Sequence, residues 1–208
     1  MADTHRSSTT IERPRDDSRP RRVDQPGGPA FERRDSPPIT APARDRSLST
    51  HPVAIALRVN GKSIEDVVAP RETLLDWLRE GLGLSGTKKG CNEGACGTCT
   101  VLVEGQRMNA CLTLAVQCDG KAVTTVEGIA AADGTLHPVQ QAFIDHDAFQ
   151  CGYCTPGQIV SAVACIAEGH ATDPATVREW MSGNLCRCSC YPQIVEAVLA
   201  AAQRAGGR

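Results

Sequence analysis

The sequence predicts an α+β protein: a small β-grasp domain over residues 53–130, followed by a four-helix-bundle domain over residues 131–208. Two observations support this prediction. In the first segment, two hairpin patterns flank one helix and a glycine-rich cysteine loop. In the second segment, helical apolar spacing recurs and prolines stand at or just before each helix start, where a missing N–H costs little.

Residues 1–52 form a separate block that is rich in Arg and Pro and has almost no periodic apolar pattern. Such a segment cannot bury enough surface to offset its ordering entropy, so we expect a disordered tail. The whole chain of 208 residues has a net charge of −2, which argues against a nucleic-acid-binding protein. No apolar run approaches the ~20 residues that span a bilayer, so we expect no membrane insertion.

The β-grasp segment opens with AIALRVNGKSIEDVV, which predicts two strands joined at Asn60-Gly61, a strong hairpin signal. A helix is expected from Leu74, with Thr73 as its N-cap and Gly81 at its end. The run TVLVEGQRMNA predicts a second hairpin that turns at Glu104-Gly105. A further short strand is expected over residues 123–126.

Four helices are expected in the second segment. Each combines apolar positions at helical spacing with a nearby proline. Their predicted ranges are 139–146, 157–168, 174–181 and 192–201.

The cysteines carry the functional signal. There are eleven, an odd number that excludes a fully paired disulfide framework. Eight fall into two quartets. The spacing within each quartet suits reduced thiols that bind a metal better than it suits disulfide pairs, which favours a reducing compartment. The first quartet has the C-x4-C-x2-C spacing of plant-type [2Fe–2S] ferredoxins, in which four thiolates hold one cluster. Its members are Cys91, Cys96, Cys99 and a fourth cysteine further along the chain.

The fourth ligand of the first quartet could be Cys111 or Cys118. A hairpin that turns at Glu104-Gly105 pairs Cys99 with about residue 110, which returns Cys111 to its side. We therefore assign Cys111 as the ligand and Cys118 as a small buried hydrophobe. A structural zinc site with the same four thiolates is the alternative.

The second quartet is Cys151-x2-Cys154 with Cys186-x-Cys188. Both pairs stand just before predicted helix starts, where helix dipoles favour a negatively charged cluster. This spacing is less specific, because C-x2-C also occurs in redox dithiols and C-x-C in zinc sites. Cys190 continues the even spacing, so Cys188 and Cys190 could instead be the second ligand pair.

The chain resembles the iron–sulfur subunit of the molybdenum hydroxylases, the xanthine dehydrogenase and aldehyde oxidoreductase family. The similarity covers about residues 53–203 and is nearest to the small subunit of periplasmic aldehyde oxidoreductases. It rests on the runs GTKKGCNEGACGTCTVLVEGQRMNACLTLA, TTVEGIA, LHPVQQAFI, FQCGYCTPGQIVSA and MSGNLCRC.

The resemblance implies two [2Fe–2S] clusters and a heterotrimeric oxidoreductase. It places Gln150 and Cys188 against the molybdopterin of a large subunit. The implied electron route runs from substrate to molybdenum, pterin, helical-domain cluster, β-grasp cluster and then FAD on a medium subunit. The implied ligands are Cys91, Cys96, Cys99 and Cys111 for the first cluster, and Cys151, Cys154, Cys186 and Cys188 for the second.

We therefore expect the electron-transfer subunit of an enzyme that oxidises aldehydes to carboxylic acids, with no catalytic residue in this chain. One alternative is the small subunit of a hydroxylase of xanthine, other purines or other N-heterocycles. More remote alternatives are a zinc-stabilised binding module and a free-standing ferredoxin or redox sensor.

Two departures from the family pattern stand out. CRC is followed here by Ser189-Cys190-Tyr191, where the family usually has Thr-Gly-Tyr or a similar small pair, so Cys190 is expected to be a spectator or a swapped ligand. Exported relatives carry a twin-arginine signal with an apolar stretch, whereas Arg33-Arg34 is followed by a polar, proline-rich run. A cytoplasmic location is therefore expected, with the periplasm as the alternative.

Overall fold

The computed structural model describes residues 51–206, with side chains to Arg204, and all of them belong to one structural unit. The expected disorder of the tail and the Arg33-Arg34 pair concern residues that lie outside this range. Among residues 51–206, no helix is both long and apolar enough to cross a membrane.

The first hairpin forms as predicted. Strands β1 (Val53–Val59) and β2 (Lys62–Val68) pair antiparallel around the turn at Asn60 and Gly61. Both turn residues have positive φ, 52° and 79°, which matches the right-handed twist of the flanking strands.

The second hairpin also has a two-residue turn in which both residues have positive φ. Strands β3 (Thr100–Val103) and β4 (Gln106–Asn109) join at Glu104 and Gly105, with φ of 51° and 80°. The fifth strand, β5 (Ala122–Thr124), starts one residue and ends two residues earlier than predicted, and it pairs with both β1 and β3. The sheet order is β2-β1-β5-β3-β4, and β1 and β5 are parallel, so the sheet is mixed.

The helix after Thr73 begins as predicted but changes its winding. The Thr73 hydroxyl accepts a hydrogen bond from the Asp76 N–H at 3.1 Å and caps α1 (Leu74–Asp76). The chain then continues as the π-helical segment η1 (Trp77–Gly81), and Leu82 donates to the Trp77 carbonyl five residues back. Two short 3₁₀ turns, η2 (Ala115–Cys118) and η3 (Val126–Gly128), complete this half.

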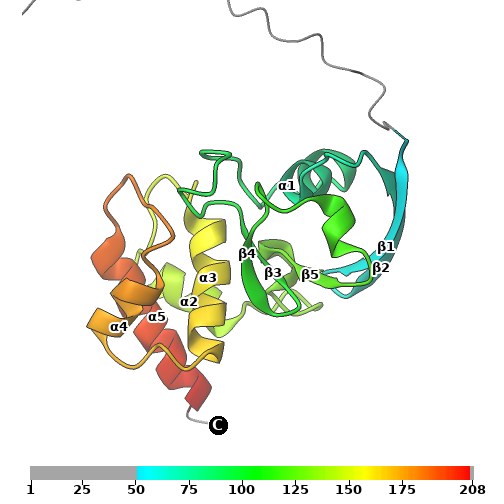
Figure 1. The fold of residues 1–208 in the computed structure, drawn as a ribbon. Coiled ribbons are helices and arrows are strands. Elements are labelled where there is room, and N and C mark those ends of the chain that lie inside the picture. Colours follow the sequence, from blue (N-terminus) through cyan, green and yellow to red (C-terminus); the bar gives the residue numbers. More distant parts are fainter. Residues whose placement is uncertain (1–50, 207–208) are drawn as a thin grey trace, which may run out of the picture. The chain divides into compact units, whose positions relative to one another are not determined.

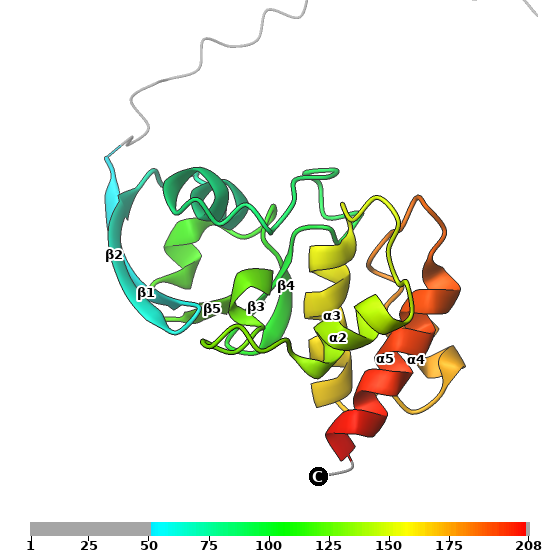
Figure 2. The same cartoon turned by 180° about the vertical axis from the view of Figure 1, so that it is seen from behind.

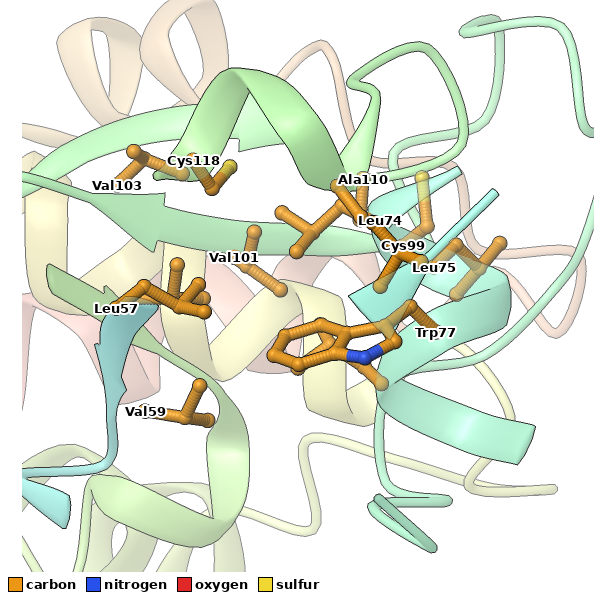
Figure 3. Packing of buried hydrophobic residues seen from close by; sticks show 14 of the residues in the cluster. Leu57, Val59, Leu74, Leu75, Trp77, Cys99, Val101, Val103, Ala110 and Cys118 are labelled. Carbon is orange, nitrogen blue, oxygen red and sulfur yellow. The ribbon is translucent and has the colours of Figure 1, made fainter. Parts of the chain in front are cut away.

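A hydrophobic core lies between the sheet and this helical turn (Figure 3). The indole of Trp77 is its largest buried side chain, and its Nε1 donates a 2.7 Å hydrogen bond to the Asp66 carboxylate. Leu74, Leu75 and Val101 are fully buried beside it. The core therefore depends on one large aromatic ring in a chain that has few others.

Replacing Trp77 by alanine is expected to destabilise the fold by about 3–5 kcal/mol, because a large cavity opens in this core. Urea denaturation of the intact chain measures the change. Val67→Ala is the matched control: Val67 is exposed on β2, so its loss should change stability by no more than about 0.5 kcal/mol. Equal midpoints for the two variants would contradict this prediction.

Four α-helices follow in the described residues, each within two residues of its predicted start. The last helix runs five residues beyond its predicted end, because AAAQRAG is rich in strong helix formers. Helix α3 lies alongside β3 and β4 in both views, and α2, α3 and α4 all contact α5 (Figures 1 and 2). The helices are α2 (Pro138–Asp145), α3 (Thr155–Ala167), α4 (Pro174–Trp180) and α5 (Tyr191–Gly206).

Candidate metal centres

The first cysteine loop runs from η1 to β3 and brings Cys91 and Cys96 together. The Cys91 N–H points at the Cys96 Sγ at 3.4 Å, and the Glu93 N–H points at the Cys91 Sγ at 3.5 Å. Backbone N–H groups aimed at sulfur stabilise thiolate charge. Both cysteines are partly exposed, so this pair forms the outer side of the first site.

Cys99 and Cys111 form a second, buried pair in the same site. The β3–β4 ladder continues through the Ala110 N–H, which donates to the Cys99 carbonyl at 3.3 Å. This register brings the Cys111 thiol next to the Cys99 thiol, so that the two side chains interact. The two residues are only 2% and 5% exposed. The β3–β4 hairpin therefore has the predicted register, which places Cys111 beside Cys99.

Cys91 and Cys99 differ in how readily their thiols ionise. The Glu93 N–H, with further help from Cys96, lowers the pKa of Cys91 to about 7. Burial raises the pKa of Cys99 to about 12. Cys99 will therefore keep its proton unless a positive metal centre compensates the buried charge, which is the coupling expected of a metal ligand.

Cys118 lies in the hydrophobic core, away from this site. It is 1% exposed in η2 and lies beside Val103, well separated from Cys99 in Figure 3. Burial raises the pKa of its thiol, as expected of an inert core cysteine.

The second site is assembled from two loops. Cys151 and Cys154 immediately precede α3, and Cys186 and Cys188 lie in the loop between α4 and α5. The thiols interact as pairs across the two loops, Cys151 with Cys188 and Cys154 with Cys186. The structure thus brings together two segments more than thirty residues apart.

Like the first site, the second site has one thiol with a lowered pKa and one with a raised pKa. The Tyr153 N–H, two residues on, lowers the pKa of Cys151, just as the Glu93 N–H does for Cys91. Burial raises the pKa of Cys154 to about 12. Cys190 borders this site, because its thiol interacts with the Cys186 thiol and its Sγ lies 4.0 Å from the Cys188 carbonyl oxygen.

Pairwise grouping of the thiols fits a two-iron cluster. A tetrahedral zinc site needs four ligands around one ion. A [2Fe–2S] cluster instead spreads four cysteines over two irons. The donor set, thiols with backbone N–H groups aimed at sulfur, therefore fits two such clusters.

The loops of the two sites are in direct contact. Gly97, between Cys96 and Cys99, has a φ of 65°, and an added Cβ would lie only 2.2 Å from the Gly183 carbonyl oxygen. Asn184 and Gln158 are buried at this junction, and neither was singled out from the sequence. Asn184 stands in the run MSGNLCRC, but local patterns do not reveal a contact made across more than eighty residues.

Gly97→Ala is expected to be strongly destabilising. The left-handed conformation costs about 1–2 kcal/mol for a residue with a Cβ, and the forced displacement of the junction adds about 1–3 kcal/mol. Gly152→Ala is the matched control, because Gly152 also has a positive φ of 78° but free space around its Cβ position. The melting temperature and iron content of both variants test this prediction. A smaller fall in melting temperature and iron content for Gly97→Ala than for Gly152→Ala would contradict it.

Family models match both halves of the described chain. Residues 57–124 match a 2Fe-2S iron-sulfur cluster binding domain, and residues 125–199 match a [2Fe-2S] binding domain. Two adjoining domains of this kind define the class, a protein with two [2Fe–2S] clusters.

The chain is also similar to characterised proteins. It is 54% identical over 159 residues, 69% of each chain, to the aldehyde oxidoreductase iron-sulfur-binding subunit PaoA of Escherichia coli K12. It is 46% identical to the nicotine 6-hydroxylase small subunit of Paenarthrobacter nicotinovorans, over 75% of this chain and 93% of that one. Quinoline 2-oxidoreductase of Pseudomonas putida 86 superposes with a TM-score of 0.72 and 45% identity, over 76% of this chain and 98% of that one.

These similarities settle the family. The chain belongs to the iron–sulfur small subunits of the xanthine dehydrogenase and aldehyde oxidoreductase family of molybdenum hydroxylases. The resemblance seen in the cysteine motifs is thereby confirmed.

Proposed function

We propose that this chain is the electron-transfer subunit of a molybdenum hydroxylase that oxidises aldehydes to carboxylic acids. The observation that carries the proposal is the direct contact between two four-cysteine sites, in which the Leu185 N–H donates to the Cys96 carbonyl at 2.9 Å. When bound, the two clusters carry single electrons from a molybdopterin-binding large subunit toward an FAD-binding medium subunit.

The proposed ligands follow the observed pairs. In the first site, Cys91 with Cys96 suits one iron and Cys99 with Cys111 the other. In the second site, the pairs that suit one iron each are Cys151 with Cys188 and Cys154 with Cys186.

The chain's own residues hold, polarise and shield these sites. Burial of Cys99, Cys111 and Cys186 limits access of water to the inner sulfur atoms. The N–H groups of Glu93 and Tyr153 point at the outer ones and stabilise their negative charge. Each proposed site thus has a dry inner side and a hydrogen-bonded outer side.

The second site is the proposed receiving side. Gln150 and Cys151 are exposed, and Cys188 is partly exposed. Phe149, Tyr153 and Leu185 of the same two loops are between 42% and 50% exposed, an apolar surrounding that suits a protein partner. We propose that Gln150 and Cys188 face the molybdopterin of the large subunit.

The two sites are proposed to lie in separate domains, residues 53–130 and 131–208, with a four-helix bundle as the second. Two distinct groups of buried hydrophobic residues support this division: one surrounds Trp77 and the other lies among α2, α3 and α5.

Co-expression with the neighbouring genes and purification of the complex test the proposed function. We expect two irons per cluster in this chain, visible iron–sulfur absorption, molybdenum and FAD in the complex, and aldehyde oxidation. A colourless chain that contains zinc, or one that never binds a molybdopterin subunit, would contradict the proposal.

A second candidate substrate class is N-heterocycles. The relatives named for nicotine and quinoline oxidation are 46% and 45% identical to this chain, which keeps this class open. A purine and a quinoline assayed beside an aldehyde separate the two classes, because the substrate pocket is proposed to lie on the large subunit.

We propose a cytoplasmic location for the complex. The eleven cysteines are an odd number, and the spacing of the two quartets suits reduced ligand thiols, which a reducing compartment maintains. Cell fractionation with detection of this chain provides the test, and recovery in the periplasmic fraction would contradict the proposal.

A further inference from the structure

Asn184 lies at the contact between the two cysteine loops. It is 6% exposed and precedes Cys186 by two residues. Its side-chain Nδ2 donates to the Gly97 carbonyl at 2.8 Å and to the Thr100 hydroxyl at 3.2 Å. Gly97 lies inside the first cysteine loop, so one amide of the second loop is bound directly to the first.

The side-chain oxygen and the backbone carbonyl of Asn184 are held from α3. The Ser161 hydroxyl donates to Oδ1 at 2.7 Å, and the Gln158 Nε2 donates to the Asn184 backbone carbonyl at 2.9 Å. Ser161 and Gln158 are each 1% exposed. Because every polar group of the amide has a partner, its orientation is defined, and Nδ2 must point at the first loop.

The backbone segments that meet at this contact lie so close together that a side chain on either glycine would clash. A Cβ on Gly157 would lie 2.5 Å from the Gly97 carbonyl oxygen, and one on Gly97 would lie 2.2 Å from the Gly183 carbonyl oxygen. The Leu185 N–H also donates to the Cys96 carbonyl, so one hydrogen bond joins the proposed ligand Cys96 to the residue that precedes the proposed ligand Cys186.

The contact is open on one side. A cavity of about 310 Å³ borders Asn184 and is also lined by Thr100, Arg107 and Trp180. No packed side chains fill this space, so the loops have room to shift if the amide is lost. At the cavity wall, the Arg107 guanidinium joins the two halves: it pairs with the Glu168 carboxylate at 2.6 Å and donates to the Trp180 carbonyl at 2.8 Å. We expect these bonds to keep the halves attached when Asn184 is replaced.

We propose that Asn184 is a positioning residue that clamps the first cysteine loop to the second and so sets the separation and coupling of the two clusters. The inference rests on the proposed function, because it requires both quartets to hold clusters. Electron tunnelling falls off exponentially with the separation of redox centres, so even a small displacement of one loop would slow transfer between them.

The experiment uses the purified complex with wild-type chain, Asn184→Asp, Asn184→Ala and Ser161→Ala. Asn184→Asp keeps the shape and the acceptor for Ser161 but removes the Nδ2 donor. EPR of the fully reduced complex measures the magnetic splitting between the clusters, and freeze-quench measures the rate at which an electron passes between them. We expect the splitting and the rate to fall in both Asn184 variants, and less in Ser161→Ala, with iron content unchanged.

Asn109→Ala is the matched control. The Asn109 Nδ2 donates at 3.3 Å to the Gly94 carbonyl of the first cysteine loop, and both residues lie in the first half of the described chain. Its splitting and transfer rate should equal those of the wild type. An equal fall in Asn109→Ala would show that loosening the first loop alone suffices, and would overturn the inference.

Different results would contradict the proposed function and the clamp role of Asn184. A wild-type complex without two cluster signals would contradict the proposed function. A wild-type complex with two coupled clusters, whose splitting and rate are unchanged in Asn184→Asp and Asn184→Ala, would overturn only the clamp. Loss of iron from the second site in all three variants would also overturn it, since Asn184 would then support ligation rather than position.

Discussion

Replacing Cys111 by serine is expected to remove the first cluster and leave the second. The Cys111 thiol lies against that of Cys99 in the buried part of the first site. A serine hydroxyl is a harder and far less acidic donor than a thiol, so one iron of this site loses a ligand. Iron and sulfide content should fall by one cluster, and one of the two EPR signals should disappear.

Cys118→Ser is the matched control for this prediction. Cys118 is equally buried but belongs to the hydrophobic core, where its thiol is expected to bind no metal. Both clusters should remain, while the buried hydroxyl lowers stability by about 1–3 kcal/mol. Retention of both clusters in Cys111→Ser, with loss of one in Cys118→Ser, would show that the ligand assignment from the hairpin register is wrong.

Replacing Cys188 by serine is expected to remove the second cluster and leave the first. Cys188 pairs with Cys151 across the two loops of the second site, beside the pair that Cys154 forms with Cys186. Because cluster binding contributes to folding, the melting temperature should fall together with the iron content. EPR of the reduced chain and its thermal unfolding measure both effects.

Cys190→Ala tests whether the neighbouring thiol takes part. The Cys190 thiol interacts with the Cys186 thiol. Cys190 comes two residues after Cys188, however, and lies at the edge of the second site. The expected result is two clusters with little change in either signal. Loss of the second cluster in this variant, with its retention in Cys188→Ser, would identify Cys190 as the ligand in place of Cys188.

Local signals predicted the hairpins and the helix starts. The turns at Asn60-Gly61 and Glu104-Gly105 depend on residues that tolerate positive φ, a property of the turn itself. Thr73 caps its helix through its own hydroxyl. Pro138 and Pro174 occupy the first helical position of α2 and α4. Each of these signals acts within a few residues, so the sequence shows it directly.

Features that depend on packing were not predicted. The change from α1 to the π-helical turn at Trp77 occurs where the indole is buried in the core and bonded to Asp66 of a neighbouring strand. The parallel pairing of β1 with β5 joins strands that are more than sixty residues apart. Neither the winding of one turn nor a long-range pairing is encoded in local apolar spacing.

The sequence by itself determined the class of this protein. Two cysteine quartets, one in a glycine-rich loop and one before two helices, indicate two [2Fe–2S] sites, because ligand spacing and turn chemistry are local. Only the tertiary structure decided which thiols of the second quartet meet and how the two sites are joined. The pairing of Cys151 with Cys188 and the bond from Asn184 to Gly97 are contacts between distant segments, and they arise only when both halves pack together.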